Sequence, residues 1–223
     1  MPETQYPPSQ TLADPADRFP ITYVAALQDL GAALAPDTDA TIWTRAVPNA
    51  VQDWLDALPP QQLPSGRFVL PPMLVADCMA KMFTDSKIPS SQALNWLCED
   101  AERMAHVVTG LVGTDLVRLR LEPVFDDACS KLHIDNVVAR LICTYRGPGT
   151  ILGLEPEIEA GLLNVQTGQP VLLKGKLWPG DLLPKLRHRS PTIAGSGVSR
   201  LMLVLEGCTE NDIFSAYDDV YQS

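Results

Sequence analysis

Two histidines and one aspartate are the residues of this chain whose types and spacing indicate metal chemistry. The stretch KLHIDNV carries His133 two positions before Asp135. Alternate side chains of a strand point to the same side, so a strand here would project both residues together. The chain holds three histidines, and another of them, His188, follows Asp135 by 53 positions. In a sheet, several strands can intervene over that distance and return the chain, which predicts a metal site of His133, Asp135 and His188.

This set of ligands favours a limited group of ions. Two imidazoles and one carboxylate on one face of a divalent ion leave its other positions open, as in non-haem Fe(II) oxygenases. The same ligands bind Zn(II), Ni(II) or Mn(II), so they do not fix the metal. The competing interpretation is a hydrogen-bonded polar pair of His133 and Asp135 on a sheet. His106 is expected to be an exposed or half-buried residue near the end of a helix. Cys129 lies four residues before His133, close enough in sequence to flank it.

The N-terminal half shows mainly helical patterns. Residues 1–22 are rich in Pro, Gln, Asp and Thr and are expected to form an extended arm. Apolar residues at helical spacing follow in ITYVAALQDLGAAL, and TIWTRAV is typical of a short strand. Three further helices are predicted over residues 48–58, 71–83 and 90–113, the last opening at Ser90 or Ser91 and ending near Gly110.

From residue 114 the pattern changes to a period of two. In DLVRLRLEPV, apolar residues alternate with Arg118, Arg120 and Glu122, and short strand-like runs such as LHIDNV and RLMLVLE continue to residue 206. This pattern predicts an α+β fold, with an antiparallel double-stranded β-helix core, jelly-roll or cupin-like, and N-terminal helices packed outside it. The expected parts are the arm (1–22), a helical part of the same domain (23–113) and the metal-binding core (114–223).

Composition excludes several classes of function. The formal net charge is −10, and no Lys or Arg cluster is long enough to follow a phosphate backbone, which argues against nucleic acid as a partner. No apolar run approaches the length of a membrane span and no signal peptide is evident, so a cytoplasmic protein is expected. The five cysteines include no CxxC pair and are interpreted as reduced thiols.

The strings HIDN, RLICTYRGPGT, VLLKGKLWPGDLLPKLRHRSP and RLMLVLE together resemble the core of the Fe(II)- and 2-oxoglutarate-dependent oxygenases. The resemblance covers residues 115 to 206. It implies that His133, Asp135 and His188 hold the metal and act in catalysis. It also implies that Arg200 binds the distal carboxylate of 2-oxoglutarate and that Tyr145 gives this carboxylate a second hydrogen bond. Many relatives carry Ser or Thr two residues after the arginine, where this chain has Met202.

More narrowly, the strings LRLE, DDACSKLHIDNV, CTYRGPGT and LLKGKLWPG resemble a bacterial family classed only as a domain of unknown function. That likeness implies an association with zinc-responsive loci beside metallochaperone GTPases.

The expected function is that of an Fe(II)/2-oxoglutarate-dependent dioxygenase acting on a small-molecule or peptide substrate. One alternative is a non-catalytic metal-binding cupin in zinc or other metal homeostasis, with Zn(II) as its ion. Another is a structural jelly roll whose histidines are incidental. If the strand registers differ, Arg140, Lys174, Arg187 or Arg189 would replace Arg200. The substrate and the oligomeric state stay open.

Overall fold

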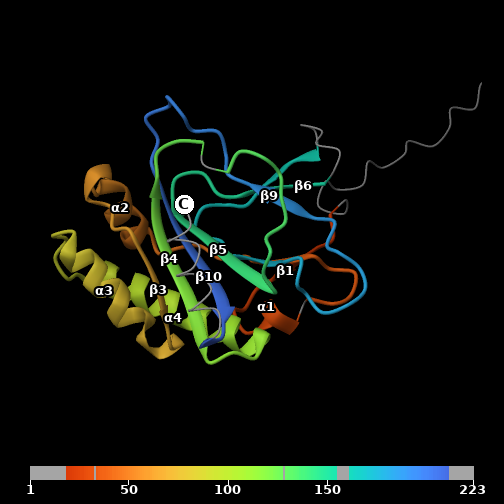
Figure 1. Cartoon of the computed structure of the whole chain (residues 1–223). Helices are drawn as coiled ribbons and strands as arrows, with labels where there is room; N and C mark the ends of the chain where they lie inside the picture. Colours follow the sequence, from red (N-terminus) through yellow and green to blue (C-terminus); the bar gives the residue numbers. More distant parts are fainter. Residues whose placement is uncertain (1–18, 33, 128, 155–160, 211–223) are drawn as a thin grey trace, which may run out of the picture.

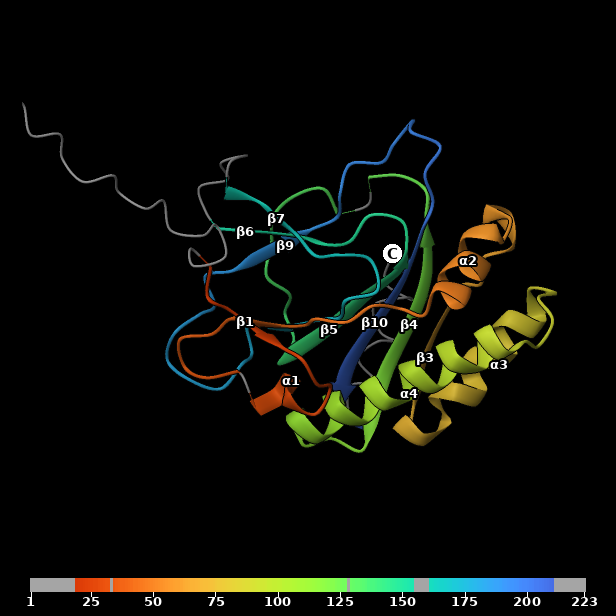
Figure 2. The same ribbon diagram turned by 180° about the vertical axis from the view of Figure 1, so that it is seen from behind.

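A computed structural model describes residues 19–32, 34–127, 129–154 and 161–210. It shows an α+β structure in which helices cover one face of a large sheet and a small sheet lies across the other face (Figure 1). The view from behind shows the same layers, with the small sheet and the helices again on opposite sides of the large sheet (Figure 2).

Within the described residues, seven strands form the large sheet in the order β1-β2-β8-β5-β10-β4-β3. The pairing of β1 with β2 is parallel, and the other pairings are antiparallel. The strands are β1 (Ile21–Val24), β2 (Ala40–Trp43), β3 (Gly66–Leu70), β4 (Leu116–Val124), β5 (Ala139–Arg146), β8 (Val171–Lys174) and β10 (Arg200–Cys208).

The small sheet has the order β7-β6-β9 and is antiparallel. Its strands are short, namely β6 (Ile151–Gly153), β7 (Leu163–Asn164) and β9 (Arg187–Arg189). Leu152 of β6 lies opposite His188 of β9, so this sheet carries one of the predicted metal ligands.

Two cores follow from the alternation of side chains along the central strands. On β10, Leu201, Leu203 and Leu205 belong to the core under the helices, whereas Met202 and Val204 belong to the core between the two sheets. Because successive side chains of a strand point to opposite faces, one leucine-rich strand supplies both cores. The predicted site and its surroundings lie on the face away from the helices.

The helices begin and end at recognisable signals. The longest, α4 (Gln92–Val112), is capped by Ser91, whose Oγ accepts a hydrogen bond from the Leu94 amide at 3.1 Å. It ends at Gly113, whose φ of 71° suits glycine, three residues after the predicted end near Gly110. The others are α1 (Asp29–Ala32), α2 (Asn49–Ala57), α3 (Val75–Asp85) and the 3-10 helices η2 (Pro60–Gln62) and η3 (Pro72–Leu74).

Two predicted elements differ from the structure. The helical pattern of residues 21–34 is wrong over its first four residues, because the β-branched segment Ile21–Val24 forms strand β1 against β2. Of the residues described in this stretch, only Asp29–Ala32 are helical. The predicted strand LHIDNV is not a strand either, and His133 makes an isolated bridge instead. Of the predicted arm, residues 1–18 lie outside the described residues and Ile21 and Thr22 belong to β1.

The part predicted as helical, residues 23–113, also contributes strands β2 and β3 to the large sheet. Among the described helices, none has the length and apolar character that crossing a membrane requires.

Candidate metal centre

The backbone joins the two predicted histidine ligands directly. The His133 amide donates a hydrogen bond to the His188 carbonyl at 3.0 Å, and the His188 amide donates to the His133 carbonyl at 3.0 Å. This antiparallel bridge sets the two imidazole rings 4.4 Å apart between their centroids. Asp135 follows two residues later, and its own carbonyl accepts a hydrogen bond from the Lys176 amide at 2.8 Å.

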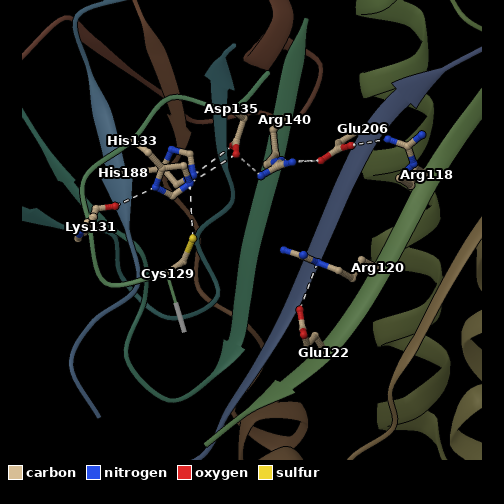
Figure 3. Close-up of polar contacts among 10 residues, drawn as sticks. All are labelled: Arg118, Arg120, Glu122, Cys129, Lys131, His133, Asp135, Arg140, His188 and Glu206. Carbon is tan, nitrogen blue, oxygen red and sulfur yellow. Dashed lines mark hydrogen bonds and ion pairs between the residues drawn. The ribbon is translucent and has the colours of Figure 1, made fainter. Parts of the chain in front are cut away.

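His133, Asp135 and His188 converge on one point (Figure 3). One ligand atom from each residue lies within 4.8 Å of the corresponding atoms of the other two. Nε2 of His133 is 3.5 Å from Oδ1 of Asp135, and Nε2 of His188 is 3.1 Å from Oδ2. The three residues predicted from the sequence are therefore brought together, although Asp135 does not lie on a strand.

The protonation of the group suits a divalent cation. Burial alone would raise the pKa of Asp135, but the nearby His188, Arg140 and His133 outweigh it and lower that pKa, so the carboxylate is ionised. Burial lowers the pKa of His188, a shift that Asp135 only partly offsets, which favours the neutral imidazole. Neutral imidazole and ionised carboxylate are the forms that bind a metal.

Two further contacts fit a bound ion. Oδ2 of Asp135 is buried and has no hydrogen-bond partner within the described chain, because the nearby His188 lacks hydrogen-bond geometry. Nδ1 of His133 lies 2.9 Å from the Lys131 carbonyl and is assigned as the donor, which leaves the lone pair on Nε2 facing Asp135. A buried carboxylate oxygen without a donor is the kind of atom that a cation satisfies.

A chain of ion pairs leads away from the centre along the inner face of the sheet. Arg140 of β5 forms an ion pair with Oδ1 of Asp135 and donates from Nε to Oε1 of Glu206 at 2.6 Å. Oε2 of Glu206 in turn lies 3.2 Å from Nη1 of Arg118 (Figure 3). Arg140 thus orients the Asp135 carboxylate and connects the candidate centre to strands β10 and β4.

Cys129 lies at the edge of the centre. Its side chain is exposed, its Sγ is 3.8 Å from Nε2 of His133, and its backbone adopts a φ of 58°. A positive φ is unusual for a residue other than glycine. The thiol is therefore positioned beside Nε2 of His133, as the sequence spacing suggested.

Arg200 is fully buried in the space between the two sheets. Its Nε donates to the Pro148 carbonyl at 2.7 Å, and its two terminal nitrogens lie 3.3 Å from the hydroxyls of Ser190 and Thr144. Among the described residues no carboxylate pairs with it, and burial lowers its pKa to about 10. Ser190 directly follows β9, the strand of His188, so the guanidinium is linked to the segment that carries a predicted metal ligand.

Tyr145 does not lie with Arg200, which corrects the prediction that it binds the cosubstrate. Its ring is buried in the core under the helices, and its hydroxyl donates to Oδ2 of Asp100 at 2.7 Å. Burial and the adjacent Asp100 carboxylate raise the pKa of Tyr145 well above its ordinary value. The residue of β5 that reaches Arg200 is its neighbour Thr144, because alternate residues of the strand face opposite cores.

The substitutes considered for Arg200 have other contacts. Arg140 is engaged with Asp135 and Glu206, and Nζ of Lys174 donates to the Ala35 carbonyl at 2.7 Å. Met202, which stands where a hydroxyl residue was expected, places its Sδ 3.8 Å from Nη2 of Arg200. The hydroxyls missing from position 202 are supplied by Thr144 and Ser190.

The structure also brings together residues that sequence reasoning missed. A cavity on the inner face is lined by Arg67, Arg118, Arg120, Arg140, Val204 and Glu206. The alternation in DLVRLRLEPV places Arg118 and Arg120 on one face, but no local signal connects them to Arg67 or Arg140.

The comparison with protein families decides the membership of the chain. The family described as "Protein of unknown function (DUF1826)" matches residues 25–206. The chain belongs to the DUF1826 family. This match confirms the expected likeness to a family defined only as a domain of unknown function. The matched residues include both helices and strands of the two sheets. No curated protein matches this DUF1826 chain significantly.

Solved structures similar to this DUF1826 protein include two dioxygenases for auxin oxidation. The rice enzyme has a TM-score of 0.50 at 17% identity, with 87% of this chain and 84% of that chain covered. The Arabidopsis thaliana enzyme, solved as a 2-oxoglutarate complex, has a TM-score of 0.49 at 10% identity, with coverages of 87% and 97%. At such identities the likeness to the rice enzyme concerns the fold alone.

Proposed function

We propose that this protein is an Fe(II)- and 2-oxoglutarate-dependent oxygenase. The observation that carries the proposal is the convergence of two imidazoles and one ionised carboxylate, with their ligand atoms within 4.8 Å of one another. In this proposal His133, Asp135 and His188 would hold Fe(II), and a set of three protein ligands would leave it able to bind further ligands. Bound Fe(II) supplies the oxygen chemistry, and the protein holds and orients the reactants.

The cosubstrate would be held at Arg200. A fully buried guanidinium with neutral hydrogen-bond partners is stabilised by an incoming carboxylate, with which it forms a charge-assisted, bidentate contact. The hydroxyls of Thr144 and Ser190 keep the guanidinium in place and are within reach of the same carboxylate. Met202, whose Sδ lies 3.8 Å from Nη2 of Arg200, adds an apolar neighbour to this group.

The fold supports the proposal. Two sheets enclose the core that contains the site, and the overall fold is similar to that of the rice dioxygenase. We interpret the pair of sheets as a double-stranded β-helix, with the N-terminal helices on its outside. The substrate would be a small molecule or a peptide, because a net charge of −10 disfavours nucleic acid.

Spectroscopy on the iron-loaded protein tests the proposal. Purified protein should bind about one Fe(II) per chain under anaerobic conditions, and adding 2-oxoglutarate should produce a visible metal-to-ligand charge-transfer band. The His133→Ala variant should lose both the iron and the band, whereas a folded Arg200→Gln variant should keep the iron and lose the band at the same cosubstrate concentration. Iron binding by wild type without any band would overturn the oxygenase proposal.

One observation favours a second candidate, a non-catalytic zinc-binding protein. The thiol of Cys129 is 3.8 Å from Nε2 of His133, and a thiolate with two imidazoles and a carboxylate would complete a tetrahedral zinc site. The Cys129→Ser variant separates the two candidates. Unchanged metal content and an unchanged charge-transfer band favour the oxygenase, whereas a large loss of Zn(II) affinity favours the zinc-binding protein.

A further inference from the structure

A positively charged cavity lies next to the candidate metal centre. It has a volume of about 140 Å³ and is lined by Arg67, Arg118, Arg120, Arg140, Val204 and Glu206. Its lining thus contains four guanidiniums and one carboxylate, in a chain whose net charge is −10. Arg67 is exposed, so the cavity reaches the solvent on the side of β3.

Strand register concentrates this charge. Arg67 of β3 lies directly opposite Arg120 of β4, and Arg118 is on the same face of β4 two residues away. Like charges directly opposite each other on a sheet are destabilising. The carboxylates nearby are fewer than the guanidiniums: Glu206 is shared by Arg118 and Arg140, and Glu122 lies 3.2 Å from Arg120.

One guanidinium of the cavity has an unsatisfied donor. Nε of Arg120 is buried, and within the described chain it has no hydrogen-bond partner, because Glu122 lies beside it without hydrogen-bond geometry. Arg67 makes no ion pair with any residue that the structure describes. A buried N–H donor and an unpaired guanidinium on the same cavity wall are suited to the oxygen atoms of an anion.

The cavity and Arg200 occupy different positions along the inner face. Arg200 begins β10, and Glu206 lies six residues further along it, which is about 20 Å for an extended strand. Arg140 contacts both Glu206 and Asp135, so the candidate metal centre borders the cavity at this point. The side chains at the two ends can therefore hold two different anions.

We infer that Arg67, Arg118 and Arg120 bind an oxyanion group, a carboxylate or a phosphate, of the primary substrate. This inference rests on the proposed oxygenase function, because the anion would hold the substrate beside the metal while Arg200 holds 2-oxoglutarate. The small volume of the cavity suits the anionic group alone, and the remainder of the substrate would extend past Arg140 toward Asp135. Val204 gives the cavity an apolar floor.

Binding of small anions to the full-length protein tests the inference. Acetate and inorganic phosphate are titrated at low ionic strength, and acetamide serves as the neutral counterpart of acetate. Arg67→Gln and Arg120→Gln should each weaken binding of the preferred anion at least tenfold, and Arg67→Lys should restore part of it. Arg103→Gln is the control, because it removes a partly exposed guanidinium from helix α4, outside both proposed anion sites, and it should leave this binding within about twofold. Circular dichroism establishes that each variant is folded.

The preferred anion identifies the anionic group of the primary substrate. Tighter binding of acetate indicates a substrate with a carboxylate, and tighter binding of phosphate indicates a phosphorylated substrate. The inference is overturned if wild type binds neither anion, if it binds acetamide equally well, or if Arg200→Gln abolishes the binding while Arg67→Gln does not.

The iron and 2-oxoglutarate band separates this inference from the proposed function. Arg67→Gln should keep the band at the wild-type cosubstrate affinity, and loss of the band in this variant would assign the cavity to 2-oxoglutarate and overturn the inference. Anion binding that depends on Arg67, in a wild-type protein that lacks the band, would support the anion site and overturn the oxygenase proposal alone.

Discussion

Two buried arginines lie on opposite sides of the large sheet, and their surroundings differ in one respect. Arg45, on the helix side, forms a bidentate contact with Asp100, with nitrogen-to-oxygen distances of 2.5 and 2.7 Å. Arg200, between the sheets, contacts a carbonyl and two hydroxyls and pairs with no carboxylate among the described residues. Both guanidiniums are removed from water, but only Arg45 has a negative partner.

The pKa values of the two groups express the same difference. For Arg45, burial alone would lower the pKa, but the hydrogen bond with Asp100 and the charge of that carboxylate outweigh it and raise the pKa. For Arg200, burial acts without such compensation and lowers the pKa to about 10. A buried charge with a complete partner belongs to the scaffold, whereas a buried charge without one is suited to a ligand of opposite charge.

The largest effect is expected when the complete pair is broken. Asp100→Asn leaves Arg45 buried without its negative partner, and such a change costs about 3–5 kcal/mol of unfolding free energy. Urea denaturation followed by circular dichroism measures it. Asp85→Asn at the exposed pair with Lys81 is the control, and it should cost less than about 1 kcal/mol. A loss of that smaller size for Asp100→Asn would mean that Arg45 does not depend on this pair.

A different outcome is expected from Arg200. Arg200→Gln removes a buried charge that has no carboxylate partner, which offsets part of the cost of the lost hydrogen bonds. The unfolding free energy of the ligand-free protein should therefore fall by less than the loss of about 3–5 kcal/mol expected for Asp100→Asn. The affinity of the iron-loaded protein for 2-oxoglutarate should fall at least about 100-fold, because two charged hydrogen bonds are lost. Titration of the charge-transfer band gives the affinity. A large loss of stability with unchanged affinity would make Arg200 a scaffold residue like Arg45.

The smallest effects distinguish the two adjacent residues of β5. Tyr145→Phe deletes the hydrogen bond to Asp100 and should cost about 1–2 kcal/mol of stability without changing the affinity for 2-oxoglutarate. Thr144→Val deletes a hydroxyl beside Arg200 and should weaken 2-oxoglutarate about 2- to 10-fold. Denaturation and band titration on both variants measure the two quantities. If Tyr145→Phe weakened 2-oxoglutarate more than Thr144→Val, the assignment of the two faces would be wrong.

Much of the candidate centre could be predicted because its residue types are rare and chemically specific. The three histidines of the chain include both residues that meet Asp135, and Arg200 lies 12 positions beyond His188. The prediction did not depend on a correct secondary structure. Residues 132–137 are not a strand, yet the backbone bridge between His133 and His188 brings the ligands together.

The error at Tyr145 has a physical cause. Strand β5 is buried on both faces, so Ile142 and Thr144 are as well buried as Cys143 and Tyr145, and the alternation of polar and apolar residues that would assign each face is absent. The pairing of β10 with β5 also shifts register between Leu201 and Met202. The position of a β10 residue in the sequence therefore does not by itself give its partner on β5. The cavity was missed for another reason, since Arg67 reaches Arg120 only through the pairing of strands far apart in sequence.

The backbone bridge between His133 and His188 has a consequence for how an ion is loaded. The backbone hydrogen bonds between His133 and His188 already hold two of the three candidate ligands next to each other. Metal binding therefore does not have to bring these two residues together from distant parts of a flexible chain. Most of the ordering entropy is then lost during folding rather than at the moment of coordination. Metal should therefore enter and leave a folded protein, and stripping it with a chelator should be reversible without a refolding step.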